Sequence, residues 1–148
     1  MSESARDEAV VASPFNRRIV DEFRANGGRV GGALAGTPMI LVHHFGARTG
    51  IERVTPVACT PQDDGRYVVI GSNGGAPAHP HWVHNLRAHP STTVEFGTET
   101  IPVLAEELAG AERAEVWAQQ VARYPQVADF QASTAREIPL FMLTPREG

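Results

Sequence analysis

Six short segments rich in apolar and β-branched residues constrain the fold of this chain more than any other feature. Tight turns such as Asp63-Asp64-Gly65 and Gly97-Thr98 separate some of them. The segments are residues 39–45, 53–60, 66–70, 92–96, 99–105 and 138–143. Strands joined by tight turns pair antiparallel, so the pattern predicts an α+β protein built on a small barrel or curled sheet. Pro56 predicts an edge position or a bulge in the second segment.

A helix is predicted over residues 14–25, directly after the capping residue Ser13. Phe15, Ile19 and Phe23 follow one another at intervals of four and form a narrow apolar stripe flanked by arginines. Two alternatives stay open for this stripe. It packs on the rest of the domain, or it belongs to a surface helix that contacts a membrane or covers an anion pocket.

Two further helices are predicted later in the chain. Residues 79–88 begin with His79-Pro80, and Pro80 suits the first helical position. Residues 111–123 carry one apolar face and end before Pro125. We expect that face to be the packed one, with Trp117 in the core, and it consists of Ala114, Trp117, Ala118 and Val121.

The composition is that of one globular domain with a buried core. The chain has 148 residues, of which 42% are hydrophobic, and we expect a disordered tail over residues 1–13 before a single domain over 14–148. A net charge of −4 excludes a general nucleic-acid binder. Cys59 is the only cysteine, so no internal disulfide can form. No run approaches the ~20 apolar residues of a membrane span, and we expect a cytoplasmic protein.

Two glycine-rich loops, each after a predicted strand, are the strongest indication of a binding site. The first runs from Gly46 to Gly50 and is followed by Arg53; the second runs from Gly71 to Gly75. Glycines allow close approach of a ligand to backbone N–H groups, and the forked guanidinium groups of Arg48 and Arg53 suit phosphate or carboxylate. The loops predict one polyanionic ligand across both, although neither has the spacing of a P-loop or a Rossmann fingerprint.

The second loop leads into the predicted helix 79–88, whose free N–H groups favour an anion. Trp82, Asn85 and Leu86 are spaced to share one face of that helix. We expect the indole of Trp82 to form a wall for a planar ring. Ser72 has two open interpretations, a hydrogen bond to a ligand carbonyl or simple turn chemistry.

Metal binding and hydrolysis are both less favoured by the residue patterns. His81 and His84 are separated by three positions with no acidic residue between them, and His43 and His44 would point to opposite faces of a strand. We therefore predict no metal site. A serine hydrolase motif is absent, and nothing marks Cys59 as an activated nucleophile.

At these positions the chain resembles the deazaflavin-dependent nitroreductase family, over roughly residues 15–145. The resemblance lies in several ordered motifs rather than in one loop. These motifs are Gly46–Gly50, Arg53–Pro56, Ser72–Ala76, Pro80–Leu86, Tyr124-Pro125, Asp129 with Gln131, and Ile138-Pro139.

The resemblance implies a split β-barrel like that of FMN-binding proteins, the coenzyme F420, and hydride transfer to a small electron-poor acceptor such as a quinone, an enone or a nitro compound. It implies that the first loop holds the phosphate and glutamate tail of F420, and that the later segments hold the ring. The implied cofactor residues are Ala47, Arg48, Thr49, Arg53, Val54, Thr55, Pro56, Val57, Ala58, Ile70, Gly71, Ser72, Asn73, Gly74, Gly75, His81, Trp82, Val83, His84 and Asn85.

The implied acceptor pocket consists of Tyr124, Val127 and Phe130, with Ser72 and Tyr124 as candidate catalytic residues. Val127 and Phe130 stand where the nitro-drug-reducing members carry tyrosines, which favours quinone-like or enone-like acceptors. Ala47 and Asn73 each replace a basic residue common in the family. An FMN-dependent oxidase on the same fold and a non-catalytic F420-binding protein stay open as alternatives, as does the oligomeric state.

Overall fold

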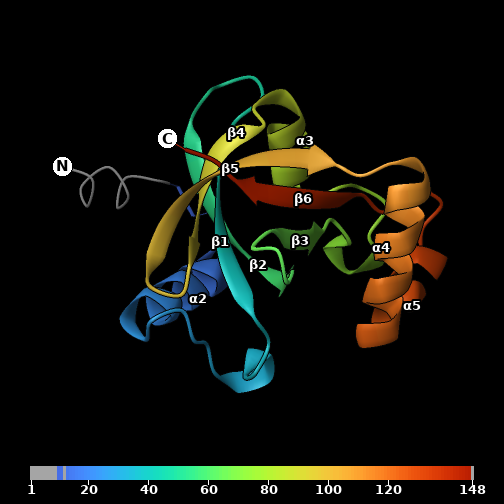
Figure 1. The fold of residues 1–148 in the computed structure, drawn as a ribbon. Coiled ribbons are helices and arrows are strands. Elements are labelled where there is room, and N and C mark those ends of the chain that lie inside the picture. The colour runs from blue at the N-terminus through green and yellow to red at the C-terminus, as the bar shows by residue number, and fades with distance from the viewer. Residues whose placement is uncertain (1–9, 12, 148) are drawn as a thin grey trace.

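Six antiparallel strands close into a barrel in the order β1-β2-β3-β6-β5-β4 (Figure 1). The computed structural model describes residues 10–11 and 13–147. The strands are β1 (Met39–Phe45), β2 (Glu52–Pro61), β3 (Tyr67–Ile70), β4 (Ser91–Phe96), β5 (Glu99–Glu107) and β6 (Leu140–Pro145). The predicted strands are confirmed, with their ends shifted by one or two residues. The expected barrel class is confirmed as well.

Four α-helices and two short 3₁₀ turns surround the barrel in the described ranges. They are α2 (Pro14–Ala25), η1 (Gly32–Leu34), η2 (Asn73–Gly75), α3 (His81–Ala88), α4 (Gly110–Arg123) and α5 (Gln126–Ala132). In Figure 1, α2 lies at one side of the barrel and α4 and α5 at the other. None of these helices is long and apolar enough to cross a membrane. The expected tail over residues 1–13 falls largely outside the described residues, although Val10 pairs with Arg53 of β2.

The pairing of β2 explains how it accommodates a proline. Pro56 faces Leu41 of β1, whereas β3 pairs with β2 only from Cys59 to Pro61. On the β3 side, the strand is therefore locally an edge at Pro56, as predicted from the missing N–H group. The cleft described below follows this unpaired part of β2.

The barrel core fixes α3 and thereby the segment after the second glycine loop. Trp82, Val83 and Leu86 of α3 are buried in the main core cluster. The indole of Trp82 packs edge-on against the ring of Phe141, with 5.9 Å between ring centroids. The helix begins at His81, two residues later than predicted, because Pro80 is extended (φ −59°, ψ 152°) and precedes the first turn.

Helix α2 packs on the barrel, which favours the first alternative for its apolar stripe. The side chain of Ser13 accepts from the Asn16 amide at 3.1 Å, so the predicted cap is confirmed. Ile19 and Phe23 are buried against β1 and β2, whereas Phe15 is 59% exposed.

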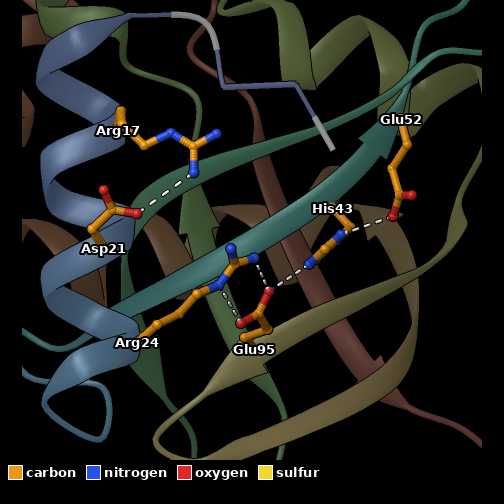
Figure 2. A network of polar contacts seen from close by, with 6 residues as sticks. All are labelled: Arg17, Asp21, Arg24, His43, Glu52 and Glu95. Atoms are coloured by element: carbon orange, nitrogen blue, oxygen red, sulfur yellow. Dashed lines mark hydrogen bonds and ion pairs between the residues drawn. The ribbon is translucent and has the colours of Figure 1, made fainter. Parts of the chain in front are cut away.

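Charged groups also tie α2 to the barrel (Figure 2). Arg24 of α2 makes a two-bonded ion pair with Glu95 of β4, at 3.1 and 2.8 Å. His43 of β1 lies between two carboxylates, with Nε2 at 2.6 Å from Glu95 and Nδ1 at 2.9 Å from Glu52. Burial opposes ionisation of Glu95, yet the hydrogen bonds from His43 and Arg24 lower its pKa to about 2.

The C-terminal helices differ most from the prediction. The face expected to pack was wrong, because Ala114 and Ala118 are exposed while Gln120 is buried. Trp117 is only half-buried, against the outside of the sheet, and its ring lies 5.0 Å from the guanidinium carbon of Arg113. Pro125 does end α4, but it also precedes α5, a helix that was not predicted.

Candidate functional site

A cleft of about 920 Å³ lies beside β2, between the second glycine loop and the helices α4 and α5. Most of the predicted cofactor residues line it, namely Arg53, Thr55, Pro56, Val57, Ala58, Ile70, Ser72, Asn73, Gly74, His81, Trp82 and His84. All three predicted acceptor residues line it as well, namely Tyr124, Val127 and Phe130.

The lining of the cleft contains an arginine and several histidines but no carboxylate in the described part of the chain. Arg53, His44, His79, His81 and His84 line it, and no Asp or Glu does. This contrasts with the net charge of −4 of the whole chain. An acidic protein that keeps carboxylates out of this cleft has a local environment suited to an anion.

The other predicted cofactor residues do not line the cleft. They are Ala47, Arg48, Thr49, Val54, Gly71, Gly75, Val83 and Asn85. Val54 and Val83 are buried core residues. A Cβ at Gly71 would lie 2.7 Å from a methyl of Val83, and one at Gly75 would lie 3.1 Å from the Phe130 carbonyl. At these two positions the protein itself, rather than a ligand, requires glycine.

The guanidinium groups of Arg48, in the first loop, and Arg53, just after it, are unpaired in the described part of the chain. The turn of the first loop is closed by the Gly46 amide, which donates to the Ile51 carbonyl at 3.0 Å. Within the described ranges, the amides of Arg48 and Thr49 have no acceptor, and the guanidinium groups of Arg48 and Arg53 have no hydrogen bond or ion pair. Arg53 is half-buried and lines the cleft, whereas Arg48 is exposed and does not line it.

One chain of hydrogen bonds runs from this loop to the cleft. The Ala47 amide donates to Oδ1 of Asn85 at 3.0 Å, so Nδ2 of Asn85 donates to Nδ1 of His44 at 2.8 Å. A neutral imidazole that accepts at Nδ1 carries its proton on Nε2, which therefore donates to Oγ1 of Thr55 at 2.9 Å. The hydroxyl proton of Thr55 is thus left for an acceptor in the cleft.

The imidazole of His44 is held neutral by its surroundings. Burial, reinforced by the positive charges of Arg53, His43 and His81, lowers the pKa of His44 to about 4. His43 and His44 do point in opposite directions, as predicted, with His43 in the network of Figure 2 and His44 at the cleft.

Arg136, which was not predicted as a site residue, fixes the second loop. Its guanidinium donates to the carbonyls of Gly71, Ser72 and Ala76 at 3.1, 2.7 and 2.9 Å. It also lies 2.7 Å from Nδ1 of His79. Burial and the charge of Arg136 lower the pKa of His79, so this imidazole accepts the bond as a neutral group.

Carbonyls of the second loop are bonded to Arg136, whereas several of its backbone N–H groups are free at the cleft in the described chain. The amides of Ser72, Asn73 and Gly74 have no acceptor among the described residues, and all three residues line the cleft. The backbone of Ser72 is in the right-handed helical region, while Asn73 (φ 48°) and Gly74 (φ 63°) have positive φ. Successive amides in such an alternation form a concave site for an anionic or carbonyl oxygen.

The opposite end of the cleft is more apolar. Val127 is buried and Phe130 half-buried, and both come from α5. The hydroxyl of Tyr124 accepts a long 3.3 Å hydrogen bond from Nε of Arg123. Burial raises the pKa of the Cys59 thiol to about 12, which agrees with the prediction that this cysteine is not activated.

Comparison with known proteins identifies the family. The family model for the F420H(2)-dependent quinone reductase matches residues 15–145. The chain belongs to this family. An F420H(2)-dependent quinone reductase of Mycobacterium tuberculosis strain H37Rv is 31% identical over 131 residues, which cover 84% of this chain and 85% of the relative.

Two solved structures are similar to this chain. The structure of an F420-H2 dependent reductase is 36% identical, with a TM-score of 0.64, covering 72% of this chain and 93% of that one. A structure described as a domain-swapped dimer is 33% identical, with a TM-score of 0.67, covering 88% and 99%. As a member of the quinone reductase family, the protein is an oxidoreductase and its cofactor is F420.

Three features of this cleft were missed from sequence. His44 could have been found, because strand alternation places it opposite His43. Arg136 gave no local signal, since it lies 64 positions from Ser72. The pair of Thr60 and Gln120 at the α4 wall was hidden by the wrong prediction of which face of α4 packs.

Proposed function

We propose that this protein binds F420 along the cleft, with the anionic tail at Arg53 and the ring beside the second glycine loop, and reduces a quinone-like or enone-like acceptor near α5. The observation that carries the proposal is the asymmetric cleft. One end carries the guanidinium group of Arg53, which has no partner among the described residues, and the other has apolar and aromatic side chains, with no carboxylate in the described lining. Its volume is at the upper end of the range for ligand pockets, about 300–1,000 Å³.

At the tail end, Arg53 offers a charge-assisted hydrogen bond to a phosphate or carboxylate, and exposed Arg48 adds positive charge beside it. Thr55 contributes a hydroxyl donor that Asn85 and His44 orient. Ala47 and Thr49 belong to the same loop, and the Thr49 amide is available for a further contact. These groups favour a long anionic tail over the single phosphate of FMN.

At the ring end, the amides of Ser72, Asn73 and Gly74 suit a ring oxygen. Trp82, Ile70 and the backbone of Val57 and Ala58 supply apolar contact area for a planar ring. When bound and reduced, F420 supplies a hydride from its own ring. The role of the protein is therefore to hold the acceptor flat beside that ring and to exclude water.

Two hydroxyl groups can serve the acceptor. Ser72 lies beside the free amides of the second loop, and Tyr124 lies on the α4–α5 wall. We propose that Tyr124 supplies a proton to the acceptor oxygen and that Ser72 orients it. Val127 and Phe130 add no donor, so quinones and enones should be better acceptors than bulky nitro compounds.

The test is a fluorescence titration of the purified protein with F420 and with FMN, followed by oxidation of reduced F420 with menadione and with a bulky nitroaromatic. We expect tighter binding of F420 and faster turnover with menadione. Tighter FMN binding would favour the FMN-dependent alternative. Tight F420 binding without turnover of any acceptor would favour a binding protein.

We also propose that α2 supports the barrel rather than a bilayer. Ile19 and Phe23 are buried, so Phe15 is the one large apolar side chain that this helix exposes. One phenylalanine with Arg17 and Arg18 gives little apolar area for membrane binding. Flotation with anionic phosphatidylserine vesicles should leave the protein unbound; co-flotation that Phe15→Ser abolishes would restore the membrane alternative.

A further inference from the structure

We propose that Gln120 donates a hydrogen bond from its side-chain amide to the carbonyl oxygen of the acceptor. The proposal rests on the function proposed above and assigns a substrate-orienting group to the α4 wall. Gln120 is 1% exposed, lines the cleft, and lies in the last turn of α4, four residues before Tyr124 at the C-cap of that helix.

The side-chain amide of Gln120 is held in place by one hydrogen bond, but its N–H donors lack a good acceptor. Its Oε1 accepts from the hydroxyl of Thr60 at 2.9 Å. Among the described residues, this leaves Nε2, with two N–H donors, facing only Oε1 of Gln119 at 3.5 Å, which is at the limit for a hydrogen bond. A buried amide with a spare donor is costly in a protein interior unless a ligand pairs with it.

The position of this pair points to the acceptor rather than to the cofactor tail. Thr60 is seven residues after Arg53 along β2, roughly 20 Å away at the rise of a strand. Gln120 and Thr60 are therefore at the α4–α5 end, with Tyr124 and Val127. Among the described lining residues of this end, Gln120 is a neutral donor that cannot lose its proton to the acceptor.

The chemistry of quinone reduction gives this donor a role. A quinone takes up one hydride, from reduced F420, and one proton, and becomes a hydroquinone. Addition of the hydride places negative charge on a carbonyl oxygen before the proton arrives. An amide that already points at this oxygen stabilises the charge without being consumed. The proton has to come from a second group, for which Tyr124 is available.

The experiment compares two hydride acceptors, menadione, which has carbonyl oxygens, and methylene blue, which has no oxygen atom. In Gln120→Leu, kcat/KM for menadione should fall at least about 10-fold, while methylene blue turnover and the Kd of F420 stay within about twofold. Thr60→Val should give a smaller loss, because Nε2 remains but is less well oriented. Glu115→Leu, at an exposed position of α4 that does not line the cleft, is the control.

A second variant tests the donor directly. Gln120→Glu should be least active with menadione at neutral pH, where a carboxylate repels the developing charge, and should recover as pH falls and the carboxyl becomes a donor. Equal losses for both acceptors, or an F420 Kd that rises in parallel, would overturn the proposal. A wild type that reduces neither acceptor would instead contradict the proposed function. Thermal unfolding of each variant checks that it is folded.

Discussion

The two glycine loops look alike in sequence but are held in opposite ways. The first loop, Gly46–Gly50, is attached through its backbone by Asn85 and leaves Arg48 and nearby Arg53 without partners in the described chain. The second loop, Gly71–Gly75, is attached through its carbonyls by the distant Arg136 and leaves backbone amides free. One loop therefore offers side-chain cations to a ligand, and the other offers N–H dipoles.

This difference teaches that an arginine near a glycine loop has two possible roles. An arginine whose donors already end on carbonyls, like Arg136, stabilises the loop and has little charge left for a ligand. An arginine whose guanidinium has no partner in the described chain, like Arg53, retains its full capacity for a phosphate or carboxylate. The experiments that follow test this division.

The largest effect is expected for Arg136→Met. Removal of the guanidinium leaves the carbonyls of Gly71, Ser72 and Ala76 without their donor, which should lower the free energy of unfolding by about 3 kcal/mol. Urea denaturation of the protein without cofactor measures this. Arg66→Met, which removes a surface pair with Asp64, is the control and should change stability by less than about 0.5 kcal/mol. Equal effects of the two substitutions would mean that Arg136 does not hold the second loop.

A pH-dependent loss of stability of similar size is expected from His44, which is linked to the first loop through Asn85. The pKa of His44 is about 4 in the folded protein, against an ordinary value of 6.5. The unfolded chain therefore binds a proton below pH 6.5 that the folded protein does not, and stability falls as pH drops from 6.5 towards 4. The loss should approach about 3 kcal/mol. The lowered pKa of His79 acts in the same direction, and the lowered pKa of Glu95 acts later, between pH 4.5 and 2.

His44→Gln should remove most of this pH dependence, because no imidazole remains to titrate. Thr55→Val is the control, since it removes the partner of Nε2 but keeps the buried imidazole. Denaturation curves at pH 4 and pH 7 give the difference for each protein. A slope that His44→Gln leaves unchanged would show that His44 is not the group that titrates.

The barrel could be predicted because its causes are local. Alternating or apolar runs between turns define strands, and turn length alone requires antiparallel neighbours. The ends of the cleft were also predictable, since Arg53, Ser72 and Phe130 belong to recognisable segments. Arg136 and Gln120 were not, because their roles depend on which distant carbonyls or hydroxyls the fold brings to them. The face of α4 was mispredicted because a buried glutamine, bonded to Thr60, interrupts the apolar pattern on which the prediction relied.

The two unpaired arginines should differ in their contribution to cofactor binding. Arg53→Ala should weaken the binding free energy of F420 by about 1.5–3 kcal/mol, the scale of a hydrogen bond to a charged group. The measured quantity is the Kd of F420. Arg48→Ala should cost less than about 1 kcal/mol and the cost should shrink at high salt, because this side chain is exposed. Arg29→Ala, on an exposed connection away from the cleft, controls for net charge. A larger effect of Arg48 than of Arg53 would place the tail outside the cleft.

The smallest effects separate the two polar side chains of the second loop. Ser72 has a hydroxyl with no hydrogen-bond partner among the described residues and lines the cleft. Asn73 instead donates to the Ala78 carbonyl at 3.0 Å and so ties the loop to the start of α3. Ser72→Ala should therefore leave stability within about 0.5 kcal/mol but weaken F420 binding or menadione turnover by about 1 kcal/mol, the net value of a neutral hydrogen bond. Asn73→Gly, which tolerates the positive φ, should do the reverse, with a loss of about 1 kcal/mol in stability and a smaller change in Kd. Urea denaturation and F420 titration on the same two variants decide this. If both variants lose stability while F420 binding and menadione turnover stay unchanged, the hydroxyl of Ser72 stabilises the turn. The second loop would then contact the ligand through its free backbone amides alone.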